Sequence, residues 1–371
     1  MPGYGRAMTS RSGIGDRIRP WVLADFGVRL LDVEPYGGGL DPDAAVWRAV
    51  DDEAREWAVK WTRRDSRFGL RLSRSLAESG VVGVPGPRVA SDGRPWSDHR
   101  GGRLSVTTWI SGEDAFETGL DLAQWREFGA LLRQVHDHEL PGAEPGVTAR
   151  RGIRRAGIHI KRRLGEIDEL VAASGESTEP AILRFVARWP EARSRIRGLQ
   201  DVAGRLKIAR APTERVTCHG DPHLGNVVLD DRGRPWLIDF DDAVRAPREV
   251  DLMLVHPGVL FGRPITEDER SAFDEGYGDL ALDRDRLTRF ACVRAVEDLV
   301  ETAHELLARD TDTRADDLEV LFLGILSPTG LAGIVEQQQQ QQHQQQSQSQ
   351  QQLVPSPLQP LPGHALQPPR D

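Results

Sequence analysis

Two carboxylates and one amide are spaced along residues 216–252 in a way that could support chemistry. Asp221 lies five residues before Asn226, and Asp239 follows further along the chain. Oxygen donors of these types bind Mg²⁺, and a carboxylate can also orient an attacking hydroxyl and accept its proton. Phosphoryl transfer from ATP requires such a set. In this interpretation Asn226 and Asp239 hold the metal and Asp221 acts on the hydroxyl.

A β-hairpin is the element that must bring these side chains together. Residues 227–229 and 236–238 are short apolar runs, and the Asp-Asp-Arg-Gly-Arg between them has the composition of a turn. Folding the second run back on the first places Asp239 beside Asn226. The alternative is a solvated acidic turn whose polar side chains only satisfy backbone groups. Asp221 and Asn226, the hairpin and then Asp239 follow one another along the chain in the order that phosphoryl transfer needs, which favours that interpretation.

The motif also resembles that of known enzymes. Protein kinases carry His-Arg-Asp, then Asn at the same spacing, then a metal-binding Asp. With His-Gly-Asp at 219–221, Ile-Asp at 238–239 and Asp-Leu at 251–252, the chain is most similar to the aminoglycoside phosphotransferase family. Within that family, the chain most resembles the spectinomycin phosphotransferases. This finer resemblance is carried by residues 238–243, 246–253, 275–278 and 296–298.

This resemblance implies an α/β (α+β), bilobal protein-kinase-like fold with a small β-rich N-terminal lobe and a larger helical C-terminal lobe. It implies that His219 braces the catalytic loop and that Asp251 accepts hydrogen bonds from it. The expected divisions are a flexible leader at 1–20, a nucleotide-binding lobe at 21–110, a catalytic and substrate lobe at 111–335 and a disordered Gln- and Pro-rich tail at 336–371. The tail is either dispensable or a tether for a partner.

The N-terminal lobe should bind the nucleotide phosphates. Strands are predicted at 28–35, 45–50 and 57–61, and period-two alternation in the third sends Lys60 to the face opposite its apolar neighbours. Kinases place a phosphate-binding lysine there, although a solvent-facing lysine is the alternative. The next helix offers no early Glu to pair with Lys60, so Asp65 or other groups must hold it.

Two backbone segments complete the expected ATP site. A glycine-rich turn could fold its N–H groups over the phosphates, although a plain hairpin turn is the alternative. Its residues are Gly37, Gly38 and Gly39. Residues 106–110 should form the hinge that reads the adenine edge, with Trp109 and Ile110 at its end.

Carboxylates predict the substrate class. A helix expected at 286–309 carries Glu297 and Asp298, and Asp241 and Asp242 follow the metal-binding Asp. A solvated acidic helix face is the alternative; the resemblance favours a pocket wall that meets, together with Asp221, a cationic aminocyclitol such as spectinomycin. Kinases of choline, homoserine or sugars share the framework and stay open, as does a kinase-like pseudoenzyme that only binds nucleotide or a partner.

The composition fits a cytoplasmic enzyme. The chain has 371 residues and a net charge of −9, which argues against a nucleic-acid-binding role and suits a cationic small molecule. Only two cysteines are present, which fits a reducing compartment. We expect no membrane span and no secretory signal. The oligomeric state is left open.

Overall fold

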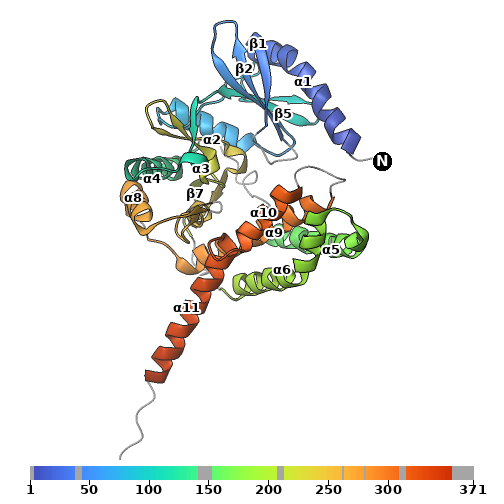
Figure 1. Cartoon of the computed structure of the whole chain (residues 1–371). Helices are drawn as coiled ribbons and strands as arrows, with labels where there is room; N and C mark the ends of the chain where they lie inside the picture. The colour runs from blue at the N-terminus through green and yellow to red at the C-terminus, as the bar shows by residue number, and fades with distance from the viewer. Residues whose placement is uncertain are drawn as a thin grey trace, which may run out of the picture.

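A five-stranded antiparallel sheet forms the N-terminal part of the chain in this computed structural model (Figure 1). The strand order is β1-β2-β3-β5-β4. The bounds are β1 Leu30–Tyr36, β2 Ala44–Asp51, β3 Glu56–Thr62, β4 Ser97–His99 and β5 Gly102–Thr108. The structure describes residues 4–37, 44–140, 153–206, 213–260, 263–279, 281–308 and 315–352. On β3 the apolar residues are buried and Lys60 points to the other face, as the alternation predicted.

A long helix, α1 (Tyr4–Phe26), packs beside this sheet, so residues 4–20 are helical where a flexible leader was expected at 1–20. Ile14, Ile18, Val22 and Phe26 are buried in one cluster with the strands. Their four-residue spacing makes a continuous apolar stripe along the helix. Burial of that stripe gives the segment the apolar contacts that a flexible leader lacks.

Helix α2 (Arg67–Glu78) belongs by its packing to the helical part of the molecule. Phe68, Leu72 and Leu76 join the large core that also contains Trp125 and Phe128 of α4. The sheet and α1 form a separate hydrophobic cluster. The described chain therefore has two main cores, and α2 lies between the sheet and the catalytic hairpin.

The C-terminal part is mostly helical, which confirms the expected α+β, kinase-like class. Its helices are α3 Ala115–Thr118, α4 Leu122–Asp137, α5 Ile153–Ala173, α6 Pro180–Arg205, α7 Glu249–Leu252, α8 Glu267–Tyr277, α9 Arg284–Ala308, α10 Ala315–Leu326 and α11 Leu331–Gln352. Its short strands are β6 Gly112–Asp114, β7 Val216–Cys218, β8 Val227–Asp230, β9 Pro235–Leu237, β10 Val244–Ala246, β11 Val259–Leu260 and β12 Arg263–Pro264. Helix α8 begins with the capping box formed by Thr266 and Glu269.

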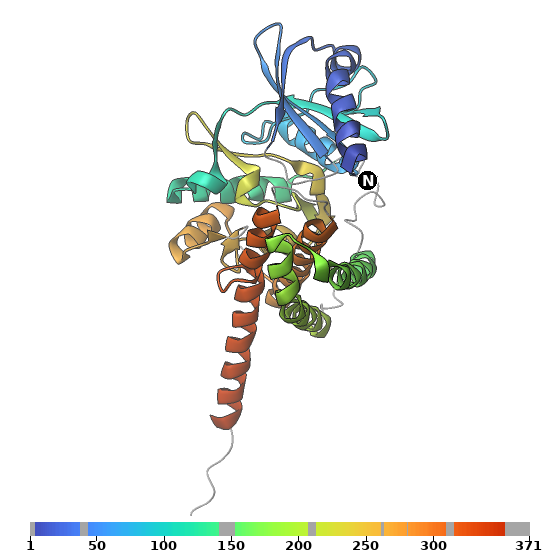
Figure 2. The same ribbon diagram turned by 45° about the vertical axis from the view of Figure 1, so that its right-hand side comes forward.

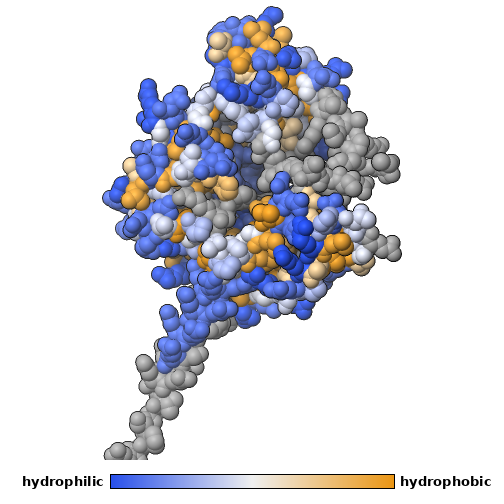
Figure 3. All heavy atoms as spheres, viewed as in Figure 1, coloured by the Kyte–Doolittle hydropathy of each residue, from blue (hydrophilic) through white to orange (hydrophobic). Residues whose placement is uncertain are grey.

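The glutamine tract continues a helix, which corrects the expected disorder from residue 336 as far as residue 352. Helix α11 starts in the core, where Leu331 and Val335 are buried, and then projects from the body (Figure 2). Gln is a good helix former, so the tract extends a helix that the core has already nucleated. Its projecting part is hydrophilic on the visible face (Figure 3). Residues 353–371 lie outside the described residues.

One stretch, Ala315–Gln341, is long and apolar enough to cross a membrane by length and composition alone. Two observations identify it as part of the core. A turn at 327–330 divides it into α10 and α11, and Leu318 and Phe322 are buried in the helical core. Core helices of globular proteins commonly pass the same hydropathy test.

Candidate functional site

The hairpin forms as predicted and brings its flanking polar residues together. Strands β8 and β9 pair antiparallel, with Val227 opposite Leu237. The N–H of Ile238 donates to the carbonyl of Asn226 at 2.9 Å, so Asp239 follows directly beside Asn226. The Nδ2 of Asn226 donates to the backbone carbonyl of Asp221 at 2.8 Å. This bond turns the amide oxygen of Asn226 away from Asp221 and leaves it as an oxygen donor for a cation.

Asp239 holds an uncommon backbone conformation at the end of the hairpin. Its φ of 60° and ψ of 67° lie in the left-handed region, which Asp and Asn tolerate better than most residues. The short 3-10 turn Phe240–Asp242 follows it. The chain thereby reverses immediately after Asp239, so Asp239 and Asp241 both reach Lys60.

A buried carboxylate braces the loop that carries Asp221. Asp251, on α7, accepts hydrogen bonds from the N–H groups of His219 at 2.8 Å and Gly220 at 2.7 Å. The Nε2 of His219 lies 2.9 Å from the carbonyl of Ile238. Gly220 has φ +90°, and an added Cβ would stand 2.0 Å from the Asp242 carbonyl oxygen. These contacts tie the loop before Asp221 to α7 and to the end of β9.

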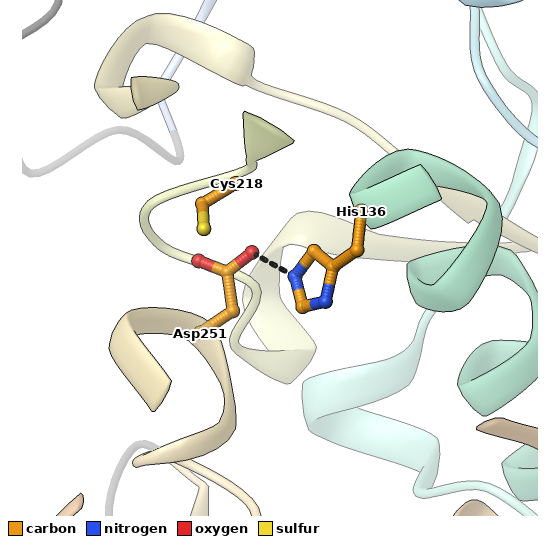
Figure 4. A group of neighbouring side chains, drawn as sticks. All are labelled: His136, Cys218 and Asp251. Atoms are coloured by element: carbon orange, nitrogen blue, oxygen red, sulfur yellow. Dashed lines mark hydrogen bonds and ion pairs between the residues drawn. The ribbon is translucent and has the colours of Figure 1, made fainter. Parts of the chain in front are cut away.

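The bracing network extends to His136 on α4 (Figure 4) and through it to Tyr277 on α8. The Nε2 of His136, on α4, lies 2.9 Å from Asp251, and its Nδ1 lies 2.6 Å from the Tyr277 hydroxyl of α8. Cys218 completes a buried His, Cys and Asp group whose ligand atoms lie within 4.8 Å of one another.

The Cys218 thiol is engaged with the backbone carbonyls of Ala246 and Pro247, at 3.6 and 3.7 Å, and burial raises its pKa. Both nitrogens of His136 are already engaged in hydrogen bonds. The group therefore acts as a packed hydrogen-bond network beneath the catalytic loop.

Lys60 meets two carboxylates of the catalytic segment. Its Nζ lies 2.7 Å from Asp239 and 2.9 Å from Asp241. Burial opposes the lysine charge, but the two aspartates outweigh it and raise its pKa. Asp65 pairs with Arg67 and Arg103 instead. The missing helix Glu is thus replaced by two Asp residues.

The two aspartates differ in their ionisation. Burial opposes the charge of Asp239, but Lys60 overcomes that effect and lowers its pKa. Burial raises the pKa of Asp241 to about 6 against the pull of Lys60, and the nearby Asp239 charge adds to the rise. Asp239 is accordingly the stronger candidate ligand for a divalent cation.

The acidic group predicted for the substrate contains cations that the sequence analysis missed. Arg294, on α9, contacts Asp221 at 2.6 Å and both oxygens of Asp298 at 2.8 and 2.9 Å. Arg64 pairs with Asp242. The four-residue separation of Arg294 and Asp298 on one helix was a readable signal for the ion pair between these two residues.

The structure gives fewer contacts for the remaining residues that the sequence predicted for the site. Glu297 is half-buried on α9. Trp109 and Ile110 follow β5 and are half-buried; the Trp109 ring meets Tyr36 edge-on at 5.3 Å. Gly37 is exposed at the end of β1. Gly38 and Gly39 lie outside the described residues.

A Mg²⁺–ATP complex fits the donors that are present. The amide oxygen of Asn226 and the carboxylate of Asp239 are hard oxygen ligands of the kind that Mg²⁺ takes together with substrate phosphates. Lys60 stands beside Asp239 on the sheet and would supply a cation for a phosphate. These residues, contributed by the sheet and by the hairpin, would hold the nucleotide between them.

Known proteins share this architecture. None of the curated proteins compared matches the chain. A crystal structure of spectinomycin phosphotransferase with ADP and spectinomycin matches with a TM-score of 0.70 at 21% identity, over 86% of this chain and 97% of that one. Amicoumacin kinase matches with a TM-score of 0.56 at 15% identity, over 85% and 94%. Choline kinase from Streptococcus pneumoniae matches with a TM-score of 0.50 at 16% identity, over 85% and 99%.

These structural likenesses show the fold. The family is shown by a sequence model described as "Phosphotransferase enzyme family", abbreviated APH, which matches residues 32–290. That span contains Lys60 and the whole catalytic segment from His219 to Asp251. The chain therefore belongs to the APH phosphotransferase family.

Proposed function

We propose that this phosphotransferase moves the γ-phosphate of ATP, with Mg²⁺, to a hydroxyl of an aminocyclitol antibiotic, and that spectinomycin is its first candidate acceptor. The observation that carries the catalytic part is the meeting of Lys60 with Asp239 beside Asn226 and Asp221. A nucleotide-binding pseudoenzyme would not need all four. The neighbouring structures contain ADP or AMP-PNP, which supports ATP as the donor.

Each residue has a role that its position supports. Lys60 holds the phosphates, and Asn226 and Asp239 hold the metal, which neutralises phosphate charge when bound. Asp221 orients the acceptor hydroxyl and takes its proton as the new O–P bond forms and the bond to the leaving ADP oxygen breaks. The hydrogen bonds of Asp251 to the loop keep the Asp221 backbone in place before substrate arrives. Gly37, Gly38 and Gly39, with the hinge backbone at Trp109 and Ile110, are proposed nucleotide contacts.

The acceptor is proposed from charge and from the neighbouring structure that holds spectinomycin. Asp221, Asp241, Asp242, Glu297 and Asp298 make the proposed acceptor site rich in carboxylates, which suits a molecule with amines. Asp221 and Asp298 are already paired with Arg294, so the amines must bind mainly at the other carboxylates. Homoserine fits such a site poorly because its own carboxylate would be repelled. Choline favours an aromatic cage, whereas the Asp221 carboxylate lies against the guanidinium of Arg294. The proposed reaction takes place in the cytoplasm, where ATP is available.

Turnover of ATP with a panel of alcohols tests this proposal. Spectinomycin should be phosphorylated faster than choline, homoserine or a neutral sugar. Asp221→Asn should bind ATP as tightly as the wild type but lose about 10²–10⁴-fold in kcat, the usual contribution of a general base. Asp231→Asn, in the exposed hairpin turn, is the matched control and should retain full activity.

Two results would count against the proposal. An Asp221→Asn enzyme that kept more than about a tenth of the wild-type kcat would remove Asp221 from its role. Expression in a sensitive bacterium should raise tolerance to spectinomycin. If expression gives no protection and another alcohol is turned over faster, the proposed acceptor is wrong. The proposed phosphotransferase activity would not be contradicted by that result.

A further inference from the structure

Arg294 is a buried cation placed at the proposed acceptor site. Only 5% of the residue is exposed, and α9 delivers its guanidinium to the side chain of Asp221. Burial opposes its charge, but Asp221 and Asp298 outweigh this effect and raise its pKa further. An arginine in such surroundings stays charged throughout the pH range of a cell.

Its two partners are carboxylates that a substrate amine would otherwise use. One nitrogen, Nη1, donates to Asp221 at 2.6 Å, while Nε lies 2.8 and 2.9 Å from the two oxygens of Asp298. The side chain of Arg294 is 6% exposed, against 18% for Asp221 and 27% for Asp298. The cation is therefore the most deeply set member of the group, and the carboxylates reach it from the solvent side.

Two consequences follow for any acceptor. A substrate ammonium near the reacting hydroxyl must compete with Arg294 for Asp221 and Asp298. It must also tolerate a fixed positive charge close by, and like charges at short range repel strongly in a partly buried site. A hydroxyl, ether or carbonyl oxygen at the same place meets a donor instead.

On these grounds we infer that Arg294 is a specificity-determining residue that fills one cation position of the acceptor site. The preferred acceptor then presents an oxygen, not an amine, beside its reacting hydroxyl, and keeps its amines away from Asp221. This inference rests on the proposed function, because it assumes that Asp221 faces the acceptor.

Binding without nucleotide tests the inference separately from turnover. The Kd values of spectinomycin, which is cationic, and of myo-inositol, a neutral cyclitol, are measured by calorimetry on the wild type and on Arg294→Gln. Removal of the guanidinium should strengthen spectinomycin binding relative to inositol binding by at least about tenfold. This is the effect expected when a substrate amine gains one charge-assisted contact with a carboxylate that Arg294 had occupied. Arg294→Lys keeps a cation there and should leave the ratio close to that of the wild type.

A second variant guards against a folding defect. Loss of one buried cation leaves two carboxylates close together, so Arg294→Gln is also combined with Asp298→Asn, which conserves net charge. In this double variant the ratio of the two Kd values should again shift in favour of spectinomycin binding. An unchanged ratio, or loss of spectinomycin binding in both variants, would overturn the inference. A wild type that phosphorylates no alcohol would instead contradict the proposed function, and that result is read from the turnover assay.

Discussion

Gly69 on α2 touches the turn that follows Asp239, and filling this contact should disturb catalysis. An added Cβ at Gly69 would stand 1.7 Å from the carbonyl oxygen of Phe240. Real Cβ contacts essentially never fall below 3.0 Å, so the helix and the turn must separate by about 1.3 Å, the difference between these two distances. Phe240 adjoins Asp239 and Asp241, which both hold Lys60.

Gly69→Ala should therefore lower kcat by about 10²-fold, the usual cost of a 1 Å misplacement. Overpacking should also reduce the free energy of unfolding by about 1–3 kcal/mol. The assays are phosphoryl-transfer kinetics and chemical denaturation.

The same substitution elsewhere gives the control. Gly165 lies exposed within α5, and its added Cβ meets no atom within 4 Å. Gly165→Ala should increase stability by about 0.5–1 kcal/mol through helix propensity and leave kcat unchanged. A Gly69→Ala enzyme with wild-type kcat would show that α2 yields without moving the Asp239 turn, and the coupling would be refuted.

Three further predictions concern stability. Ending the chain after Gln340 should leave the melting temperature unchanged. Ending it after Gly330 removes the buried side chains of Leu331, Ala332 and Val335 and should cost at least about 3 kcal/mol; equal stability of the two truncations would contradict this packing. Thr266→Ala should lose the cap of α8 and about 1 kcal/mol in denaturant unfolding, and no loss would make the capping box irrelevant. Burial raises the pKa of the Cys292 thiol from 9.0 to about 12. The neutral thiol is favoured in the folded state, so its contribution to stability is complete below pH 9 and is lost between pH 9 and 12. Stability should fall less over that range in Cys292→Ala, and an identical slope would argue against the shift.

The hairpin was predictable because its signals are local. Short apolar runs and turn residues fix the pairing of β8 and β9, and that pairing alone places Asp239 beside Asn226. The pair of Arg294 with Asp221 spans 73 residues and depends on how α9 packs beside the catalytic loop. No local pattern contains that information.

The two terminal errors have different causes. The α1 stripe of Ile14, Ile18 and Val22 was readable, but the Gly and Arg between these residues obscured it. The glutamine tract was judged by composition alone. The tract is helical because the residues before it already form a helix, and Val335 packs the start of α11 into the core.

The division of the molecule into two hydrophobic cores bears on how its melting should be measured. Charged pairs such as Lys60 with Asp239 and Arg64 with Asp242 connect the sheet side to the helical side, and salt weakens such partly buried pairs, although less than exposed ones. The sheet core can then lose cooperativity with the helical core, and a single transition temperature would average two events. Trp57 reports on the first core and Trp125 on the second, so fluorescence from single-tryptophan variants would resolve them. A nucleotide bound across both sides would merge the two transitions into one.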